Sequence, residues 1–174
     1  MVGIDGIGGI GKSALAFEVA DTCLERQLCD QVVFFNARTY LSNLVPTATY
    51  ENIINVIARE LDLSEIVYSN PLEGEQRIRT VLQQKRVLLL LDNLETASEP
   101  QARLLERVAP LLGLSRALLT SRQRFWGDVY PINLQGLSGK SAHQFIEQEV
   151  RDKGIAFSIK PDSTDLEQIV EATG

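Results

Sequence analysis

Short apolar runs alternate along the chain with longer segments in which apolar residues recur at helical spacing. An apolar run of four or five residues that ends in polar residues is typical of a parallel strand covered on both faces. Such runs predict strands over residues 32–35 and 87–91, the three apolar residues 117–119 predict another, and two less uniformly apolar stretches predict two more over 1–5 and 129–134. The run of Val and Leu over 87–91 predicts the central strand.

The segments between these strands predict helices, because their apolar residues lie three or four positions apart. The predicted helices cover residues 13–27, 50–61, 74–82, 100–112, 138–151 and 162–172. Strands that alternate with helices predict an α/β fold, since right-handed crossovers between parallel strands place helices on both faces of one sheet. The last two helices have no further strand to cover, and they predict the start of a helical subdomain.

The amino-acid composition and net charge of the chain favour a globular domain over a membrane or nucleic-acid-binding protein. The chain has 174 residues, of which 44% are hydrophobic and 23% charged, and a globular chain of this size buries about 70% of its unfolded surface. Its net charge of −6 argues against direct nucleic-acid binding by this domain, which needs a concentrated excess of Lys and Arg. There is no membrane-length apolar run and no signal peptide, so we expect a cytoplasmic protein without a membrane partner. Cys23 and Cys29 lack metal-ligand spacing and are expected to be reduced thiols.

Residues 6–13, Gly-Ile-Gly-Gly-Ile-Gly-Lys-Ser, match the Walker A pattern of Gly, any four residues, Gly, Lys and Ser or Thr. Gly6 and Gly11 allow backbone conformations that turn successive N–H groups toward phosphates. Lys12 adds a positive charge, and Ser13 opens the next helix, where its hydroxyl can bind Mg²⁺. The alternative is a glycine-rich turn that precedes Lys-Ser by chance. The residues expected to contact the nucleotide are Gly6, Gly8, Gly9, Ile10, Gly11, Lys12, Ser13 and Ala14.

Because this pattern lies between a strand and a helix, it predicts a three-layer P-loop NTPase fold with a parallel five-stranded sheet. We expect a P-loop nucleotide-binding domain over residues 1–136, followed by an incomplete helical subdomain over 137–174. The pattern begins close to the first residue, and the last residues stop as a helix ends. These ends predict a fragment cut from a longer chain.

Asp92 directly follows the predicted central strand, where a Walker B carboxylate would hold Mg²⁺ together with Ser13. The alternative is a carboxylate that only caps the strand end. The next residue is Asn93, which cannot accept a proton from the attacking water. Glu95 is the candidate general base, and its alternative is a solvated carboxylate in a turn. This arrangement predicts slow hydrolysis.

Arg122 follows Thr120 and Ser121 at the end of the fourth predicted strand. A guanidinium group there could bind two γ-phosphate oxygens at once and so distinguish ATP from ADP. The alternative is an ordinary surface arginine beside Arg124. Arg38, at the end of the second strand, is a reserve candidate for this role. The catalytic residues expected from the sequence are Lys12, Asp92, Glu95 and Arg122.

Three segments of the chain, residues 6–16, 88–93 and 118–122, together resemble the NB-ARC branch of the STAND signal-transduction ATPases. The resemblance implies that Lys12 and Ser13 bind phosphates and Mg²⁺, that Asp92 is the Walker B acid and that Arg122 is the sensor arginine. The preference for adenine nucleotides also comes from the resemblance. The family's adenine-contacting segment before the loop, and its Gly-x-Pro turn and histidine beyond the last helix, are not in this sequence.

The resemblance implies a switch in which ADP holds a larger protein closed and ATP lets Arg122 engage the γ-phosphate. Flanking effector and sensor domains would be the partners of this domain, and the ATP state would form a homo-oligomer. Two other hypotheses stay open at this stage. One is a steadily cycling AAA+-like ATPase that uses Glu95 as its base, and the other is an interaction scaffold whose nucleotide site is inert.

Overall fold

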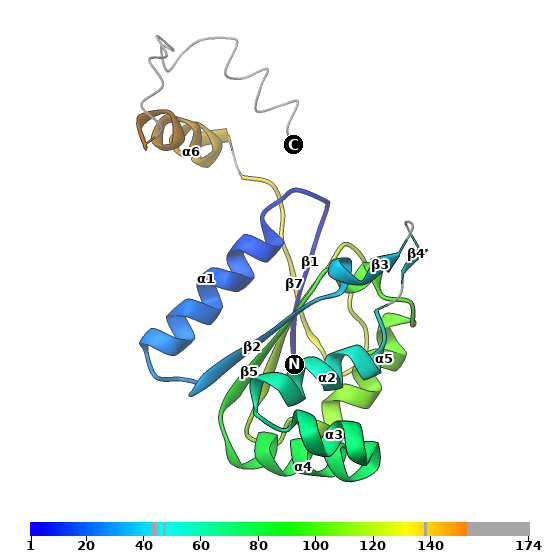
Figure 1. The fold of residues 1–174 in the computed structure, drawn as a ribbon. Helices are drawn as coiled ribbons and strands as arrows, with labels where there is room; N and C mark the ends of the chain where they lie inside the picture. Colours follow the sequence, from blue (N-terminus) through cyan, green and yellow to red (C-terminus); the bar gives the residue numbers. More distant parts are fainter. Residues whose placement is uncertain (43–44, 47, 138, 153–174) are drawn as a thin grey trace. The chain divides into compact units, whose positions relative to one another are not determined.

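The computed structural model describes residues 1–42, 45–46, 48–137 and 139–152, and Figure 1 shows its ribbon. The chain divides into two compact units, Met1–Leu134 and Gln135–Gly174. The helix expected over residues 162–172 lies outside the described residues. The expected domain boundary between residues 136 and 137 stays a prediction.

The first unit is built on a five-stranded sheet in which each neighbouring pair of strands is parallel. The strand order is β2-β5-β6-β1-β7. This arrangement confirms the predicted fold class of a parallel five-stranded sheet with flanking helices. The strands are β1 (Val2–Asp5), β2 (Gln31–Asn36), β5 (Val87–Asp92), β6 (Arg116–Ser121) and β7 (Tyr130–Asn133).

Helices and short turns connect the strands of the first unit (Figure 1). A small antiparallel hairpin, β3 (Leu41–Ser42) and β4 (Val45–Pro46), was not expected from the sequence. The helices are α1 (Lys12–Glu25), α2 (Tyr50–Glu60), α3 (Ser64–Ser69), α4 (Pro71–Gln84) and α5 (Gln101–Val108). The 3₁₀ turns are η1 (Ala37–Tyr40), η2 (Leu94–Thr96) and η3 (Ala109–Leu111).

The sheet separates two hydrophobic cores, and β5 contributes to both. Leu89 and Leu91 belong to the larger core, which also contains the apolar residues of α2, α4 and α5. Leu88 and Leu90 point to the other face, where small residues of α1 such as Ala16 pack against the sheet. Every residue of β5 is buried, because side chains on both sides of this strand meet a core. Burial against both cores therefore explains why residues 87–91 are all apolar.

The ends of two predicted helices differ from the structure by three or more residues. The helix expected over 100–112 stops at Val108 and continues only as the turn η3, because Pro110 has no N–H for another helical hydrogen bond. The helix expected over 74–82 begins earlier, at Pro71. The Asn70 side chain caps this helix by accepting a hydrogen bond from the N–H of Glu73 at 3.4 Å.

Of the second unit, the structure describes one helix, α6 (Gly139–Asp152), which matches the helix predicted over 138–151. Across the described parts of both units, no helix combines the length and the apolar character needed to cross a bilayer. The two cysteines lie in the first unit, and both are free thiols. Burial raises the pKa of the Cys29 thiol above its usual value.

Candidate functional site

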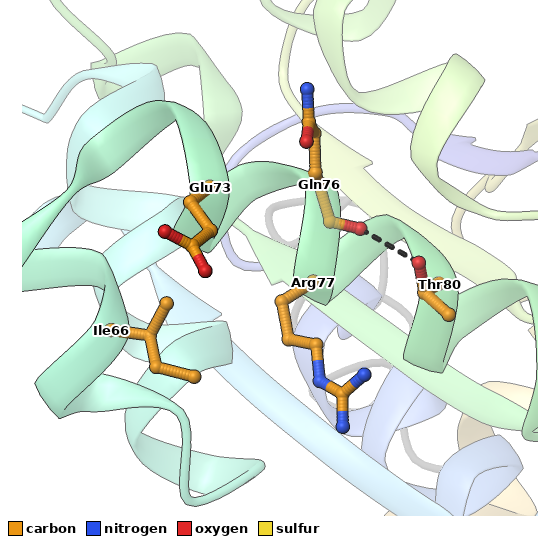
Figure 2. Close-up of a pocket in the computed structure, with 5 residues that line it drawn as sticks. All are labelled: Ile66, Glu73, Gln76, Arg77 and Thr80. Atoms are coloured by element: carbon orange, nitrogen blue, oxygen red, sulfur yellow. Dashed lines mark hydrogen bonds between the residues drawn. The ribbon is translucent and has the colours of Figure 1, made fainter.

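A surface hollow of about 360 Å³ on α3 and α4 contains no predicted site residue (Figure 2). Its lining side chains are Ile66, Glu73, Gln76, Arg77 and Thr80. The hydrogen bond drawn there, from the hydroxyl of Thr80 to the carbonyl of Gln76 at 3.0 Å, joins neighbouring turns of one helix. The predicted chemistry instead gathers at the carboxyl ends of the strands.

The loop between β1 and α1 depends on its glycines. Gly6, Gly9 and Gly11 have φ angles of 151°, 82° and 98°, in the region that residues with a side chain rarely adopt. A Cβ atom on Gly6 would also lie 2.5 Å from the carbonyl oxygen of Leu134. Gly11 is the N-cap residue of α1, whose first N–H groups have no partner within the helix.

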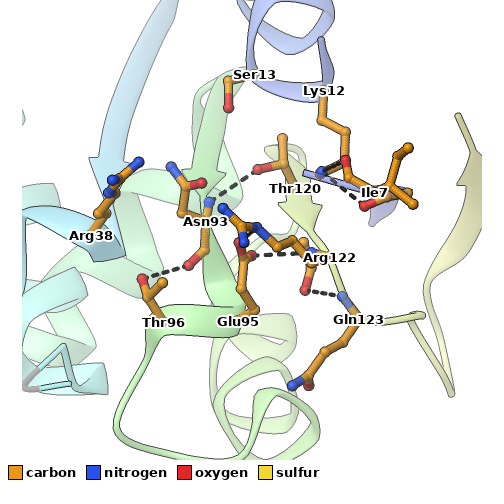
Figure 3. A network of polar contacts seen from close by, with 12 residues as sticks. Ile7, Lys12, Ser13, Arg38, Asn93, Glu95, Thr96, Thr120, Arg122 and Gln123 are labelled. Carbon is orange, nitrogen blue, oxygen red and sulfur yellow. Dashed lines mark hydrogen bonds and ion pairs between the residues drawn. The ribbon is translucent and has the colours of Figure 1, made fainter. Parts of the chain in front are cut away.

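Lys12 folds back over this loop. Its ammonium group donates hydrogen bonds to the carbonyl oxygens of Gly6 at 2.9 Å and Ile7 at 2.8 Å, and the residue is only 8% exposed. Figure 3 shows the lysine side chain reaching from the start of α1 to Ile7. A positive charge is thus held at the place where the sequence predicts phosphates. Two other predicted loop residues, Ile10 and Ala14, are half-buried and exposed, respectively.

Asp92 accepts hydrogen bonds from two other segments of the site and from the residue that follows it. One carboxylate oxygen accepts from the hydroxyl groups of Ser13 at 2.7 Å and Thr120 at 2.5 Å, and the other accepts from the amide of Asn93 at 2.7 Å. The residue is 3% exposed. The structure therefore brings together Ser13 and Asp92, the two predicted magnesium ligands, although they lie 79 residues apart in the sequence.

The backbone conformation at position 93 favours an asparagine. Its φ angle is 59°, in the left-handed region, which Asn tolerates better than most residues. Its backbone N–H donates to the hydroxyl of Thr120 at 3.0 Å, and its side-chain amide also donates to Asn36 at 3.2 Å. From the sequence, neither Asn36, which follows the apolar run over 32–35, nor Thr120 was assigned a partner in the site.

Arg122 and Glu95 form an ion pair beside the loop (Figure 3). The Nε atom of Arg122 lies 3.2 Å from Oε1 of Glu95, and the backbone N–H of Arg122 donates to Oε2 at 3.1 Å. A Cβ atom on Gly8 would lie 3.2 Å from Cζ of Arg122, so the guanidinium group is next to the loop. The reserve candidate Arg38 is exposed, and Figure 3 draws it at the end of β2.

Asp5 is a buried carboxylate that sequence reasoning treated only as the end of a strand. It accepts a hydrogen bond from the side-chain amide of Asn133, its partner in the neighbouring strand β7, at 2.6 Å. Its backbone carbonyl accepts from the N–H of Leu134 at 2.7 Å. These contacts fix the start of the loop to the end of β7. A polar residue at the end of an apolar strand, the signal that identified Asp92, could also have identified Asp5.

Comparisons with known proteins agree with this geometry. The family model described as the NB-ARC domain matches residues 1–154. The chain is 28% identical over 160 residues to the Transcription activator GutR of Bacillus subtilis (strain 168), a match that covers 84% of this chain and 18% of GutR. It is also 28% identical over 96 residues to the TMV resistance protein N of Nicotiana glutinosa, covering 55% of this chain and 8% of that protein.

Among solved structures, that of C. elegans PCH-2 aligns with this chain at 14% sequence identity and a TM-score of 0.48. The alignment covers 94% of this chain and 43% of the PCH-2 chain. The chain spans less than a fifth of the length of either curated relative.

The family match covers the whole first unit and all of the described part of the second. Within it, the structure has a strand, a glycine-rich loop and a helix that begins with Lys-Ser, the local arrangement of a phosphate-binding loop. Over residues 1–154, the chain belongs to the NB-ARC family of nucleotide-binding P-loop domains.

Proposed function

We propose that this domain binds ATP and ADP with Mg²⁺ and works as a slow ATPase switch that controls the assembly of a larger protein. The observation that carries the proposal is the 2.7 Å contact between the hydroxyl of Ser13 and the carboxylate of Asp92 at the phosphate-binding loop. A hydroxyl and a carboxylate that meet next to a lysine form the oxygen-rich side of a metal–triphosphate site.

The loop would hold the phosphates. Backbone N–H groups at the start of α1 and the ammonium group of Lys12 supply positive charge there without a broad basic surface. Lys12 has three N–H donors, and two of them are used by loop carbonyls in the structure. The residues in this role are Gly6, Gly8, Gly9, Ile10, Gly11, Lys12, Ser13 and Ala14.

Ser13 and Asp92 would hold Mg²⁺. The residues fit this ion, because it prefers hard oxygen ligands and keeps most of its shell from water and phosphate oxygens. Among the described residues, no group of three or more His, Cys, Asp or Glu side chains could hold a metal by itself. Magnesium would therefore bind together with the nucleotide. Thr120 and Asn93 would orient Asp92 through their hydrogen bonds to its carboxylate.

Hydrolysis would be slow, because the position after Asp92 holds an amide rather than a carboxylate. The amide of Asn93 is a donor to Asp92 and to Asn36, and an amide cannot act as a general base. Arg122 would contact the γ-phosphate and so respond to the difference between ATP and ADP. A switch needs this differential contact more than it needs rapid turnover.

The wider role follows from the family and from the length of the relatives. GutR is named as a transcription activator, N is named as a resistance protein, and the match spans only a small part of each. We propose that this domain, like other STAND ATPases, acts in the cytoplasm with flanking effector and sensor domains. In this proposal the ADP state is closed, and the ATP state assembles into a homo-oligomer.

The test is a calorimetric titration of ADP, ATP and GTP, each with Mg²⁺, into the purified chain and into Lys12→Ala. We expect adenine nucleotides to bind more tightly than GTP, and Lys12→Ala to lose this binding. Lys85→Ala, which removes an exposed lysine from the end of α4, is the matched control and should bind as the unmodified chain does. Equal binding by Lys12→Ala and the unmodified chain would refute the assignment of the loop.

A further inference from the structure

One carboxylate holds two donors of the same arginine. Glu95 accepts the backbone N–H of Arg122 on one oxygen and lies 3.2 Å from its Nε on the other. Both the position of the backbone at residue 122 and the direction in which the side chain leaves it are therefore fixed by a single group. The backbone contact is a hydrogen bond and the Nε contact is an ion pair, so together they favour one direction for the arginine side chain.

The pair is asymmetric in burial. The Glu95 side chain is 10% exposed, whereas the Arg122 side chain is 60% exposed. Glu95 belongs to the turn η2, which is anchored by the buried side chain of Leu94 and by a hydrogen bond from the Thr96 hydroxyl to the Asn93 carbonyl at 2.8 Å. The carboxylate is thus the fixed member of the pair and the guanidinium group is the accessible one.

The contact leaves the outer end of the guanidinium group available. Arginine has five N–H donors, one on Nε and four on the two terminal nitrogens. Glu95 takes Nε, and the terminal nitrogens of Arg122 donate no hydrogen bond to any other residue in the part of the chain that the structure describes. These nitrogens are the ones that bind two oxygens of a phosphate side by side. The guanidinium group also lies against Gly8 of the loop.

This geometry does not suit a general base. A base must accept a proton from a water molecule in the site, and it works best when an oxygen faces that water. Both oxygens of Glu95 already face donors of Arg122. These contacts favour a positioning role for Glu95, and measurement of ATP hydrolysis by Glu95→Gln distinguishes this role from that of a base in a steadily cycling ATPase.

We propose that Glu95 is a positioning residue, which holds Arg122 through its backbone N–H and Nε so that the two terminal nitrogens face the γ-phosphate. Glu95 in this role sets the preference of the site for ATP over ADP and does not take part in proton transfer. The inference rests on the nucleotide site proposed above.

The test is a double-mutant cycle on Glu95→Ala and Arg122→Ala. Binding of Mg·ADP and of a Mg²⁺-bound, non-hydrolysable ATP analogue is measured by calorimetry for the unmodified chain, both single variants and the double variant. We expect each single variant to lose about tenfold in affinity for the ATP analogue, with ADP affinity unchanged, because only the contact with the third phosphate is lost. The double variant should lose no more than Arg122→Ala alone.

Two further variants complete the design. Glu95→Gln keeps the shape of the side chain but turns an NH₂ group toward a donor of Arg122, so it should lose part of the ATP preference. Glu99→Ala is the matched control, because Glu99 also accepts a backbone N–H, that of Tyr50 at 3.0 Å, and pairs with Arg107 at 3.6 Å. Glu99→Ala should keep the ATP preference. If Glu95→Ala does not fold, Glu95→Gln decides the question.

Additive losses in the cycle, or an unchanged ATP preference in Glu95→Gln, would overturn the inference. It would also be overturned if Glu95→Gln abolished ATP hydrolysis while binding the ATP analogue normally, because that result identifies a base. Absence of ADP binding to the unmodified chain would instead refute the proposed nucleotide site itself.

Discussion

Gly3 shows how one missing side chain sets the packing of the central strands. A Cβ atom at this position would lie 2.4 Å from Cδ2 and 2.7 Å from Cγ of the Phe125 ring. The ring is buried, 2% exposed, and belongs to the larger core. Gly3 has no unusual φ angle, so the space taken by the ring, and not the backbone, requires a glycine here.

We therefore predict that Gly3→Ala destabilises the domain by about 1–3 kcal/mol, the usual cost of overpacking a core. Urea denaturation measures the loss. Phe125→Leu in the same chain should recover part of it, because the smaller side chain frees space for the new methyl group. Gly139→Ala is the control, since nothing lies within 4 Å of its Cβ position. A loss that Phe125→Leu does not reduce would contradict the steric explanation.

Asp30 provides a second prediction at this scale, one that depends on pH. Its carboxylate accepts hydrogen bonds from the side chain and backbone of Arg86, and the side-chain contact is the main reason that the pKa of Asp30 lies below 3.8. A lowered pKa means that the ionised group stabilises the folded state above pH 3.8, and that this contribution is lost as pH falls through the folded pKa.

We expect Asp30→Asn to lower the urea midpoint near neutral pH and to converge with the unmodified chain in acid. Denaturation of both proteins, followed from about pH 7 to about pH 3, measures the difference between them. Asp21→Asn is the control, because Asp21 is exposed on α1. A difference that stays constant over the whole range would mean that ionisation of Asp30 is not the cause.

At the scale of elements, Ser115 joins a helix to two strands. Its hydroxyl lies 2.7 Å from the carbonyl oxygen of Leu82 and 2.8 Å from that of Lys85, both at the end of α4. It also accepts the N–H of Val87, the first residue of β5, at 3.1 Å. Ser115 itself immediately precedes β6 and is buried. One hydroxyl therefore satisfies backbone groups where three elements meet.

Ser115→Ala should destabilise the domain by about 1–3 kcal/mol, because the buried N–H of Val87 loses the hydroxyl that accepts it and the Lys85 carbonyl loses its donor. Thermal or urea denaturation tests this expectation. Ser69→Ala removes an exposed hydroxyl that donates only to the Ile66 carbonyl, and it should cost little. If the two variants lost equal stability, the hydrogen bonds of Ser115 would not be the source of its effect.

The elements themselves were largely predictable, and their ends were not. The central strands β5 and β6 follow from apolar runs, because burial on both faces of a sheet leaves little room for polar residues. The end of α5 was missed because the helical spacing continues through Pro110 into η3. The hairpin of β3 and β4 was missed because strands this short carry no periodic signal. A helix cap such as Asn70 depends only on nearby residues. Several residues in a loop could cap a helix equally well, so the sequence does not specify at which of them the helix begins.

At the scale of the whole molecule, the sequence predicted where the site lies, but it did not predict which of the site residues are in contact with one another. Parallel strands place their carboxyl ends at one edge, so polar residues after apolar runs were expected to meet. Which of them touch depends on strand order, in which β5 lies beside β6 and β1 beside β7. The contact of Thr120 with Asp92 and that of Asp5 with Asn133 follow from this order. No pattern of residues along the chain specifies this strand order.

The last prediction concerns stability of the whole chain in the presence of nucleotide. A ligand that binds only the folded state stabilises it by mass action. At a free Mg·ADP concentration of about 100 times Kd the gain is about 2.7 kcal/mol, which for a chain of this length raises Tm by about 5–11 °C. Lys12→Ala should show almost no shift at the same concentration, whatever its own Tm, because the shift compares one variant with and without ligand.

Scanning calorimetry with and without Mg·ADP measures this shift, and omission of Mg²⁺ provides a second comparison. Because Ser13 and Asp92 are proposed to hold the ion only together with the nucleotide, Mg²⁺ alone should leave Tm nearly unchanged. A large shift with Mg²⁺ alone would point to a metal site independent of the nucleotide. An equal ADP shift in Lys12→Ala would mean that the nucleotide binds somewhere other than the loop that begins α1.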